Sequence, residues 1–205
     1  MSDQRYRTAA VLALVKTGLV LLMFLFLIFM QAAKSWGIGP VLVRGFVLVV
    51  AGGLEAYVLL SLRRLLWDRY DFHRTDVVIV VLACAAVILE ILNQMTEVAQ
   101  ILSPEHEGPI IAARILIVVV PWGVIITVYA TGLLKLPFAE KSLLRPYAYV
   151  SLAAGILLLS SILALASPVF GLFLFPFLVL AEVASAILLA LTFLRSRETE
   201  QVEFV

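Results

Sequence analysis

Residues 76–99 read DVVIVVLACAAVILEILNQMTEVA, a predominantly apolar run long enough to cross a membrane as a helix. A helix rises about 1.5 Å per residue, so about 20 apolar residues cross the hydrocarbon core of a bilayer. Similar runs recur along the 205-residue chain. Inside a bilayer every backbone amide must be bonded within its own segment, which selects helices. We therefore predict an all-α fold, a single domain formed by a bundle of six transmembrane helices at residues 9–30, 41–62, 76–99, 110–134, 147–166 and 169–194.

The composition agrees with a membrane location. The chain is 63% apolar and 14% charged, with a mean hydropathy of +1.11, whereas soluble domains are roughly 45–50% apolar and about 25% charged. Its 15 Lys and Arg nearly balance its 14 Asp and Glu, so the basic excess of a nucleic-acid-binding protein is missing and we expect no nucleic-acid partner. The single cysteine, Cys84, excludes an intrachain disulfide and a cysteine metal cage.

Basic residues in the predicted tails and loops fall on one side of the membrane. They are Arg5, Arg7, Arg63, Arg64, Arg69, Arg74, Lys135, Lys141, Arg145, Arg195 and Arg197. The opposite loops hold Lys34 and the acidic residues Glu105 and Glu107. Cytoplasmic loops carry the excess of Lys and Arg. We therefore predict that the N-terminus and the C-terminus are both cytoplasmic.

Prolines and aromatic residues indicate where the predicted spans bend, turn or end. Pro121 and Pro176 each remove a backbone hydrogen bond inside a span, so we expect a bend at each. A tight turn at Ser167-Pro168 separates the last two spans. Four aromatic residues lie near predicted helix ends, where we expect them to act as interfacial anchors: Trp36, Trp67, Tyr70 and Tyr147.

Seven ionisable residues lie within the predicted spans: Lys16, Arg44, Glu55, Glu90, Glu97, Arg114 and Glu182. A charge at bilayer depth costs about 2.5–3.5 kcal/mol on insertion scales, so such residues usually face the bundle interior and have a partner or a function. Lys16 and Glu55 both lie about 5 Å to the cytoplasmic side of the midplane, and we predict that they pair. Glu90 lies about 4 Å to the outer side of the midplane, and Arg44 and Arg114 lie about 9–11 Å to the same side. An arginine side chain is long enough to bridge this difference in depth. We therefore predict that Glu90 or Glu97 pairs with Arg114 or Arg44.

Glu182 is the exception among these residues. It falls near the centre of the last span, and no basic residue lies at its own depth. Burial without a positive partner disfavours the charged carboxylate. We therefore expect a protonated Glu182, able to donate a hydrogen bond or carry a proton.

The span at residues 76–99 carries the most specific pattern in the chain. One stripe at helical spacing holds Asp76, Ala83, Ala86, Glu90, Asn93, Gln94 and Glu97, while the opposite face is Val, Ile and Leu. We expect this helix to be central. Two interpretations stay open: a buried hydrogen-bonded network that fixes helix packing, or a ligand, proton or cation site that opens outward. In the second interpretation Glu97 lies at the mouth, Asn93 and Gln94 on the wall, and Glu90 deeper.

The predicted spans lack the residues that several known membrane-protein functions require. The two histidines, His73 and His106, lie in predicted loops, which disfavours membrane haem. The intramembrane hydroxyls of Ser160 and Ser161 have no helical histidine to act as a base. Glu105, His106 and Glu107 are adjacent in a turn rather than at ligand spacing, so we expect a solvated loop. We expect no cofactor, no metal and no enzymatic activity.

Short motifs in four of the spans resemble an uncharacterised bacterial family of six-helix membrane proteins. They are Gly52-Gly53-Leu54-Glu55, Ile88-Leu89-Glu90, Phe175-Pro176 and Leu180-Ala181-Glu182, together with the short loop at residues 141–146. Family members tend to carry an arginine one turn before the helix-three glutamate, where this chain has Val87. The resemblance implies the six-helix fold and a bacterial inner-membrane location, and it implies no activity.

The leading hypothesis is a small bacterial inner-membrane protein with a buried, carboxylate-lined polar site for a small ligand, a cation or a proton. The candidate site residues are Glu55, Glu90, Asn93, Gln94, Glu97 and Glu182, with Lys16, Arg44 and Arg114 as ion-pair partners. The alternative is a non-catalytic structural or accessory subunit of a larger membrane complex. The expected partners are the lipid bilayer and either another membrane protein or a second copy of the chain.

Overall fold

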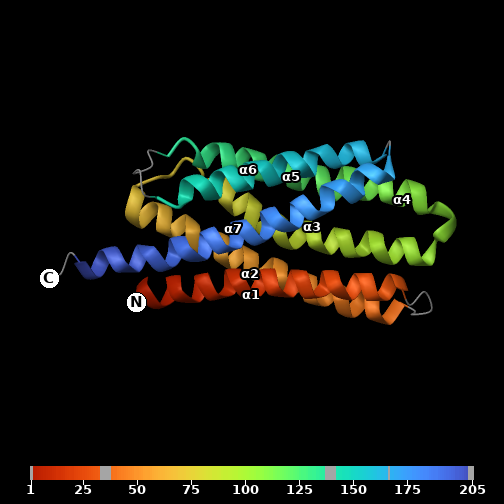
Figure 1. The fold of residues 1–205 in the computed structure, drawn as a ribbon, viewed down its shortest axis with the longest axis horizontal. Coiled ribbons are helices and arrows are strands. Elements are labelled where there is room, and N and C mark those ends of the chain that lie inside the picture. The colour runs from red at the N-terminus through yellow and green to blue at the C-terminus, as the bar shows by residue number, and fades with distance from the viewer. Residues whose placement is uncertain (1, 33–37, 137–141, 166, 203–205) are drawn as a thin grey trace.

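The regular structure that the chain forms is helical throughout its described residues. The computed structural model describes residues 2–32, 38–136, 142–165 and 167–202, so Lys34, Trp36, Lys141 and the predicted helix end at residue 166 lie outside them. The elements are α1 (Ser2–Ala32), α2 (Ile38–Tyr70), α3 (Asp76–Leu102), the 3-10 turn η1 (Pro104–His106), α4 (Glu107–Arg114), the π-helical segment η2 (Ile115–Val119), α5 (Val120–Leu133), α6 (Leu144–Ser160), the 3-10 segment η3 (Ser161–Leu165) and α7 (Pro168–Val202) (Figure 1).

Six of these helical stretches are long and apolar enough to cross a membrane, which confirms the predicted number within the described residues. The fourth is continuous from η1 to α5, at Pro104–Leu133. Several helices extend beyond the predicted spans: α2 continues to Tyr70 and α7 to Val202. Hydropathy marks the apolar part of a helix, whereas the helix itself continues through charged residues that are good helix formers.

The six spans form a closed ring. Each span packs on its neighbours in sequence: α1 on α2, α2 on α3, α3 on α4 and α5, α5 on α6, and α6 on α7; contacts between α7 and α1 then close the circle. Both chain ends lie at the same end of the bundle (Figure 1). The expectation that residues 76–99 form a central helix is therefore wrong. Helix α3 is one member of the ring, and its polar stripe does not require helices on every side because part of it borders the space inside the ring.

Close packing between neighbouring helices depends on small residues. A Cβ atom on Gly52 of α2 would lie 2.5 Å from the carbonyl oxygen of Ala86 on α3. A Cβ atom on Gly123 of α5 would lie 3.1 Å from the carbonyl oxygen of Gly155 on α6. Small residues let helix backbones approach in this way.

Two of the predicted proline features have a structural counterpart. The π-helical segment η2 ends directly before Val120, whose N–H donates to the carbonyl of Ile115, and Pro121 follows. A proline ring clashes with the carbonyl four residues earlier, and the wider π turn relieves such a clash. Pro168 begins α7, as the predicted turn requires. Pro176 lies inside α7, which continues past it as helix.

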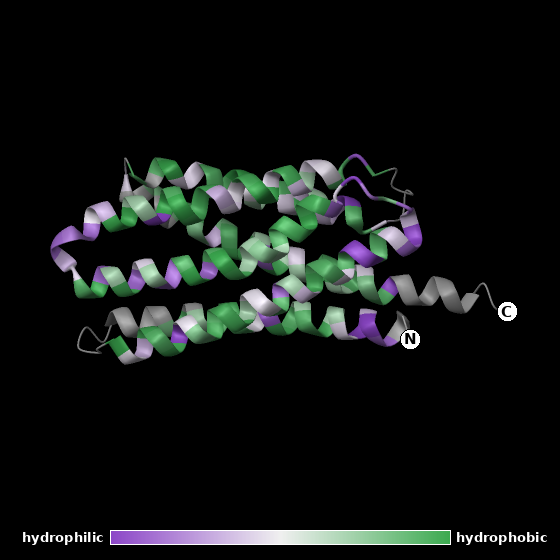
Figure 2. Cartoon of the chain, turned by 180° about the vertical axis from the view of Figure 1, so that it is seen from behind, coloured by the Kyte–Doolittle hydropathy of each residue, from purple (hydrophilic) through white to green (hydrophobic). Residues whose placement is uncertain are grey.

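Apolar side chains form both a buried core and the outer surface of the bundle. The buried apolar core lies in the half nearer the chain termini, and its fully buried side chains include Leu62, Leu65, Tyr129, Leu133 and Phe193. Large apolar side chains cover the outside, among them Phe46 and Phe173, about 71% and 70% exposed. Hydrophilic residues are concentrated toward the two ends (Figure 2). An apolar band with polar ends suits a bilayer.

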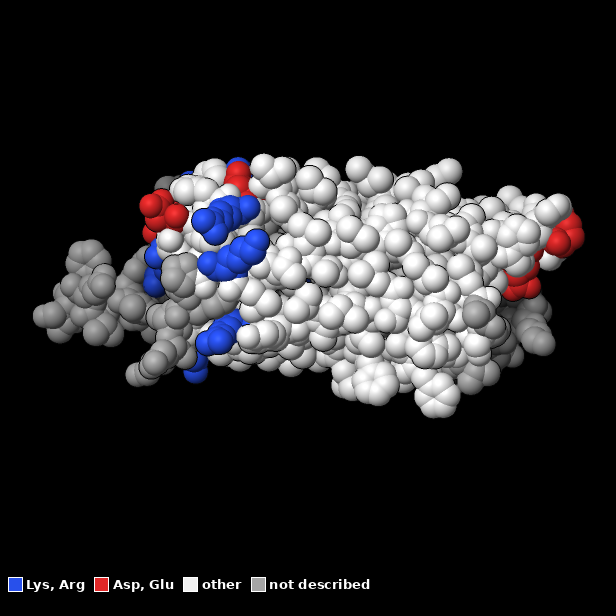
Figure 3. Space-filling model, turned by 90° about the horizontal axis from the view of Figure 1, so that it is seen from above, with Lys and Arg blue, Asp and Glu red and all other residues white. Residues whose placement is uncertain are grey.

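Charge is distributed unevenly along the long axis. On the face that Figure 3 shows, lysine and arginine side chains gather at the end that holds the chain termini, acidic side chains lie at both ends, and the surface between them is uncharged. The far end carries the exposed residues Glu105 and Glu107. We call the end with the termini the basic end and the far end the acidic end.

Candidate functional site

Two adjoining cavities lie inside the ring. The smaller, of about 80 Å³, lies toward the basic end, and the larger, of about 380 Å³, lies toward the acidic end. All six spans contribute residues to each of them. Both are lined by Lys16, Glu55, Ile126, Ala154 and Glu182. The two cavities together, which we call the lumen, therefore run along the inside of the ring and meet at a charged group.

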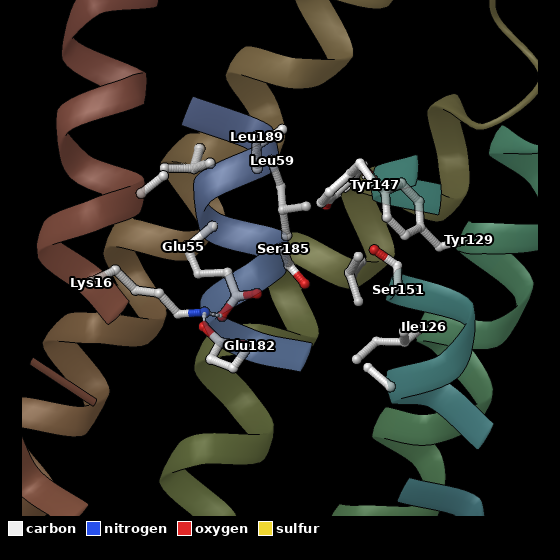
Figure 4. Close-up of a pocket in the computed structure, with 15 residues that line it drawn as sticks. Lys16, Glu55, Leu59, Ile126, Tyr129, Tyr147, Ser151, Glu182, Ser185 and Leu189 are labelled. Carbon is white, nitrogen blue, oxygen red and sulfur yellow. Dashed lines mark hydrogen bonds and ion pairs between the residues drawn. The ribbon is translucent and has the colours of Figure 1, made fainter. Parts of the chain in front are cut away.

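That charged group is the Lys16 cluster, formed by Lys16 of α1, Glu55 of α2 and Glu182 of α7. The ammonium nitrogen of Lys16 lies 2.9 Å from Oε2 of Glu55 and also donates to Oε1 of Glu182. The hydroxyl of Thr17 lies 3.4 Å from the same oxygen of Glu182. Figure 4 shows the Lys16 side chain reaching from α1 to both carboxylates. The structure thus forms the Lys16–Glu55 pair that depth matching predicts.

The structure corrects the prediction for Glu182. The sequence indicates no cation at its depth, but Lys16 bonds to it as well as to Glu55. Helices α1 and α7 are neighbours because the ring closes through them. The estimated depth difference between Lys16 and Glu182 is about 5 Å, and the long lysine side chain spans it. The reason for expecting a protonated Glu182, the lack of a positive partner, therefore no longer holds.

A pair of tyrosines borders the smaller cavity on the side away from the Lys16 cluster. The hydroxyl of Tyr129 on α5 donates to the hydroxyl of Tyr147 on α6 over 3.2 Å, and both rings are buried. Ser151 and Ser185 line the space between the tyrosines and the cluster (Figure 4). Tyr147 is thus not the interfacial anchor that its place near a helix end suggested. Sequence reasoning missed Tyr129 entirely, since a tyrosine inside an apolar run gives no signal of the face it occupies.

The larger cavity has a carboxylate of its own, Glu90 of α3. Its Oε1 accepts hydrogen bonds from the amides of Asn93, at 3.2 Å, and Gln94, at 2.5 Å. Among the described residues, Glu90 forms no ion pair within 4.0 Å. Trp122 and Phe175 also line this cavity. The wall of this cavity therefore combines a carboxylate held by neutral amides with two aromatic residues.

A second charged group, the Glu97 cluster, lies beyond Glu90 toward the acidic end. It consists of Glu97 of α3 between Arg44 of α2 and Arg114 of α4. Nη2 of Arg114 lies 2.8 Å from Oε1 of Glu97, and Arg44 contacts the other carboxylate oxygen. Nε of Arg114 donates to Oδ1 of Asn93 over 2.6 Å. Of the two glutamates predicted to pair with these arginines, Glu97 pairs with both. Asn93 accepts a hydrogen bond from Arg114 and donates one to Glu90, and so connects the Glu97 cluster to Glu90.

The predicted site residues therefore separate into three groups. Glu55 and Glu182 lie at the junction of the two cavities, and Glu90 and Asn93 line the larger cavity. Gln94 and Glu97 do not line it. Gln94 lies in a groove on the outside of α2 and α3, beside Gly45, and bonds inward to Glu90. The outward-opening arrangement with Glu97 at the mouth is thus replaced by a lumen that Glu90 and the Lys16 cluster border.

The interior charges do not balance. Three cations (Lys16, Arg44 and Arg114) face four carboxylates (Glu55, Glu90, Glu97 and Glu182), so the formal charge with all groups ionised is 3 − 4 = −1. The lumen walls are still more acidic, because Arg44 and Arg114 do not line either cavity. Among the described residues, no group of three His, Cys, Asp or Glu is placed to hold a metal ion.

Comparison of the chain with models of known protein families, with curated proteins and with solved structures gives no match. The resemblance to a six-helix bacterial family thus receives support only from the number and character of the helices. Six long apolar helices are compatible with a multi-pass membrane protein.

Proposed function

We propose that this chain is a multi-pass membrane protein that binds a small organic cation in its lumen, in exchange for a proton. The observation that carries the proposal is a cavity inside the ring whose walls hold three carboxylates and only one cation. By the positive-inside rule, the basic end faces the cytoplasm and the larger cavity lies toward the outer side of a bacterial inner membrane.

The size and lining of the larger cavity suit a small organic molecule. Ligand pockets span about 300–1,000 Å³ and combine apolar walls with a few polar groups, and this cavity measures about 380 Å³. Its apolar wall includes Leu48, Leu89, Val118, Leu158 and Leu178. A ligand with an apolar body would contact these side chains and fill the space between them.

The charges favour a cation over an anion. The one lysine in the lumen already contacts two carboxylates, and the two interior arginines contact Glu97 outside the lumen walls. Glu90 accepts hydrogen bonds from two amides and forms no ion pair with a described residue, although Arg44 and Arg114 attract it from outside the cavity wall. The ring of Trp122 can add a cation–π contact, which is worth about 2 kcal/mol or more when water is excluded.

The same charge imbalance couples the ligand to protons. A buried excess negative charge is costly and is neutralised either by protonation or by a cation. When the lumen is empty, one carboxyl holds a proton; when an organic cation binds, that proton leaves. Binding of the two is therefore mutually exclusive.

Calorimetric titration of the purified protein with benzyltrimethylammonium tests the proposal. We expect saturable binding of this cation and none of benzenesulfonate, an anion of similar size. Glu90→Gln should weaken cation binding about tenfold or more, because a hydrogen bond or contact to a charged group contributes about 1.5–3 kcal/mol. Glu105→Gln removes the same charge from an exposed position at the acidic end and should leave affinity unchanged. Equal binding of cation and anion, or equal affinity in the two variants, would contradict the proposal.

A further inference from the structure

A groove on the outside of the bundle lies at the basic end, away from the lumen. It has a volume of about 480 Å³. Tyr57, Leu60, Arg64 and Trp67 of α2 follow one another along it at helical spacing, and Arg5 of α1 borders it. None of these residues lines either cavity of the lumen. The groove is therefore independent of the proposed cation site.

Four charged residues line the groove: Arg5, Arg63, Arg64 and Asp68, so its cations outnumber its single carboxylate. Arg63 pairs with Asp76, with Nη2 2.8 Å from Oδ2, and its guanidinium lies 4.4 Å from the centre of the Trp67 ring. Asp68 accepts a hydrogen bond from the hydroxyl of Tyr6 over 3.0 Å. Asp68 interrupts the run of arginines in sequence, but this hydrogen bond holds its carboxylate toward α1.

Arg5 and Arg64 are the cations that remain available. Both are exposed, and neither forms an ion pair with a residue that the structure describes. They belong to different helices and border the same groove. A guanidinium presents a planar set of donors that matches a phosphate group, so two of them beside one hollow form a favourable site for an anionic phosphate.

The groove changes character along the helix axis. From Arg64 toward Tyr57, α2 moves about 10 Å toward the middle of the bundle. Leu60 and Tyr57, about 44% and 39% exposed, line this inner part. Trp67, about 39% exposed, lies beside the arginines, where tryptophan is typical of the headgroup level. One end of the groove is thus cationic, and the other is apolar and faces lipid.

We propose that this groove binds an anionic phospholipid. The phosphate lies between Arg5 and Arg64, and an acyl chain runs along Leu60 and Tyr57 toward the middle of the membrane. This ligand matches both halves of the groove, whereas a free phosphate matches only the cationic half. A zwitterionic lipid brings a choline charge that the arginines repel.

Native mass spectrometry of the purified protein, titrated with phosphatidylglycerol or with phosphatidylcholine of the same acyl chains, tests this site. We expect phosphatidylglycerol to bind more tightly. Arg5→Gln and Arg64→Gln should each weaken its binding about fivefold, the effect of one basic residue near an anionic lipid. Arg74→Gln serves as the matched control, because Arg74 is an exposed arginine at the same end that does not line the groove.

Equal affinity for the two lipids, or an equal loss in Arg74→Gln, would overturn the proposal, since the charge of the whole basic end would then explain the binding. Glycerol phosphate added alone should not displace phosphatidylglycerol; efficient displacement would show a headgroup site without an acyl-chain groove and would also overturn it. Because Arg5 and Arg64 lie on different helices, a folding defect in one variant leaves the other as the test. Benzyltrimethylammonium binding should be unchanged in both.

Discussion

The Lys16 cluster and the Glu97 cluster have the same arrangement of three charged groups with the signs exchanged. In the first, one ammonium group lies between two carboxylates, and in the second, one carboxylate lies between two guanidinium groups. Each joins different helices of the ring: α1, α2 and α7 in the first, and α2, α3 and α4 in the second. Only the first borders the lumen.

This difference separates a structural role from a binding role. The Glu97 cluster has its cations behind the lumen wall, where they hold α2, α3 and α4 together and attract Glu90 from outside the cavity. The Lys16 cluster presents its excess carboxylate to the lumen. Glu90 lies between the two clusters, connected to the Glu97 cluster through Asn93. The lumen is consequently acidic although the basic and acidic residues of the whole chain nearly balance.

Removing the central residue of the Lys16 cluster should have the largest effect. Lys16→Met leaves two partly buried carboxylates without a cation, and breaking such a pair costs up to about 3–5 kcal/mol. Glu182→Gln should cost less, since Lys16 keeps its contact with Glu55. Denaturation of the purified protein in detergent measures both.

The triple variant Lys16→Met, Glu55→Gln, Glu182→Gln is the control for this prediction. It removes all three charges and should recover part of the stability that Lys16→Met loses. If the triple variant loses as much stability as the three single variants lose in sum, the three residues do not act as one cluster.

Removing the centre of the Glu97 cluster should have a somewhat smaller effect, about 3 kcal/mol. Glu97→Gln leaves Arg44 and Arg114 without a counter-ion, but Arg114 lies in α4 near the acidic end, where its long side chain can turn toward solvent. Because this cluster does not line the lumen, the stable fraction of Glu97→Gln should bind benzyltrimethylammonium with the wild-type affinity. A strong loss of affinity at unchanged stability would place Glu97 in the binding site and remove the distinction between the clusters.

Helix α2 takes part in both clusters, and its contact with α3 can be tested with two adjacent glycines. Gly52→Ala places a methyl group against the Ala86 carbonyl and should destabilise the protein by about 1–3 kcal/mol, as overpacking does. Gly53→Ala meets no atom within 4 Å and should be neutral or stabilising by about 0.4–1 kcal/mol. Thermal unfolding of the two variants measures the difference. Equal melting temperatures would show that α2 and α3 do not pack this closely.

Hydropathy and depth predict the six helices, the Lys16–Glu55 pair and the pairing of interior arginines with α3. They do not predict the second contact of Lys16. Depth along the membrane normal says nothing about which helices are neighbours, and α1 and α7 meet only because the ring closes. The choice of Glu97 over Glu90 as the partner of Arg44 and Arg114 depends on the rotation of α3, which a stripe of seven residues does not determine. Buried Tyr129 gives no sequence signal, because a tyrosine inside an apolar run does not indicate which face of the helix it occupies.

If an organic cation displaces a proton from the lumen, protons must be released on binding, and their number can be measured. Calorimetric titration with benzyltrimethylammonium in two buffers of different ionisation enthalpy gives that number at each pH. A proton and the cation compete for the same carboxylate, so raising the pH removes the competitor and strengthens binding, by up to about tenfold per pH unit.

We predict release approaching one proton per cation at acidic pH and falling to zero at alkaline pH, with the release lost or much reduced in Glu90→Gln. Heats that are identical in the two buffers, with an affinity independent of pH between about pH 4 and pH 9, would contradict the account.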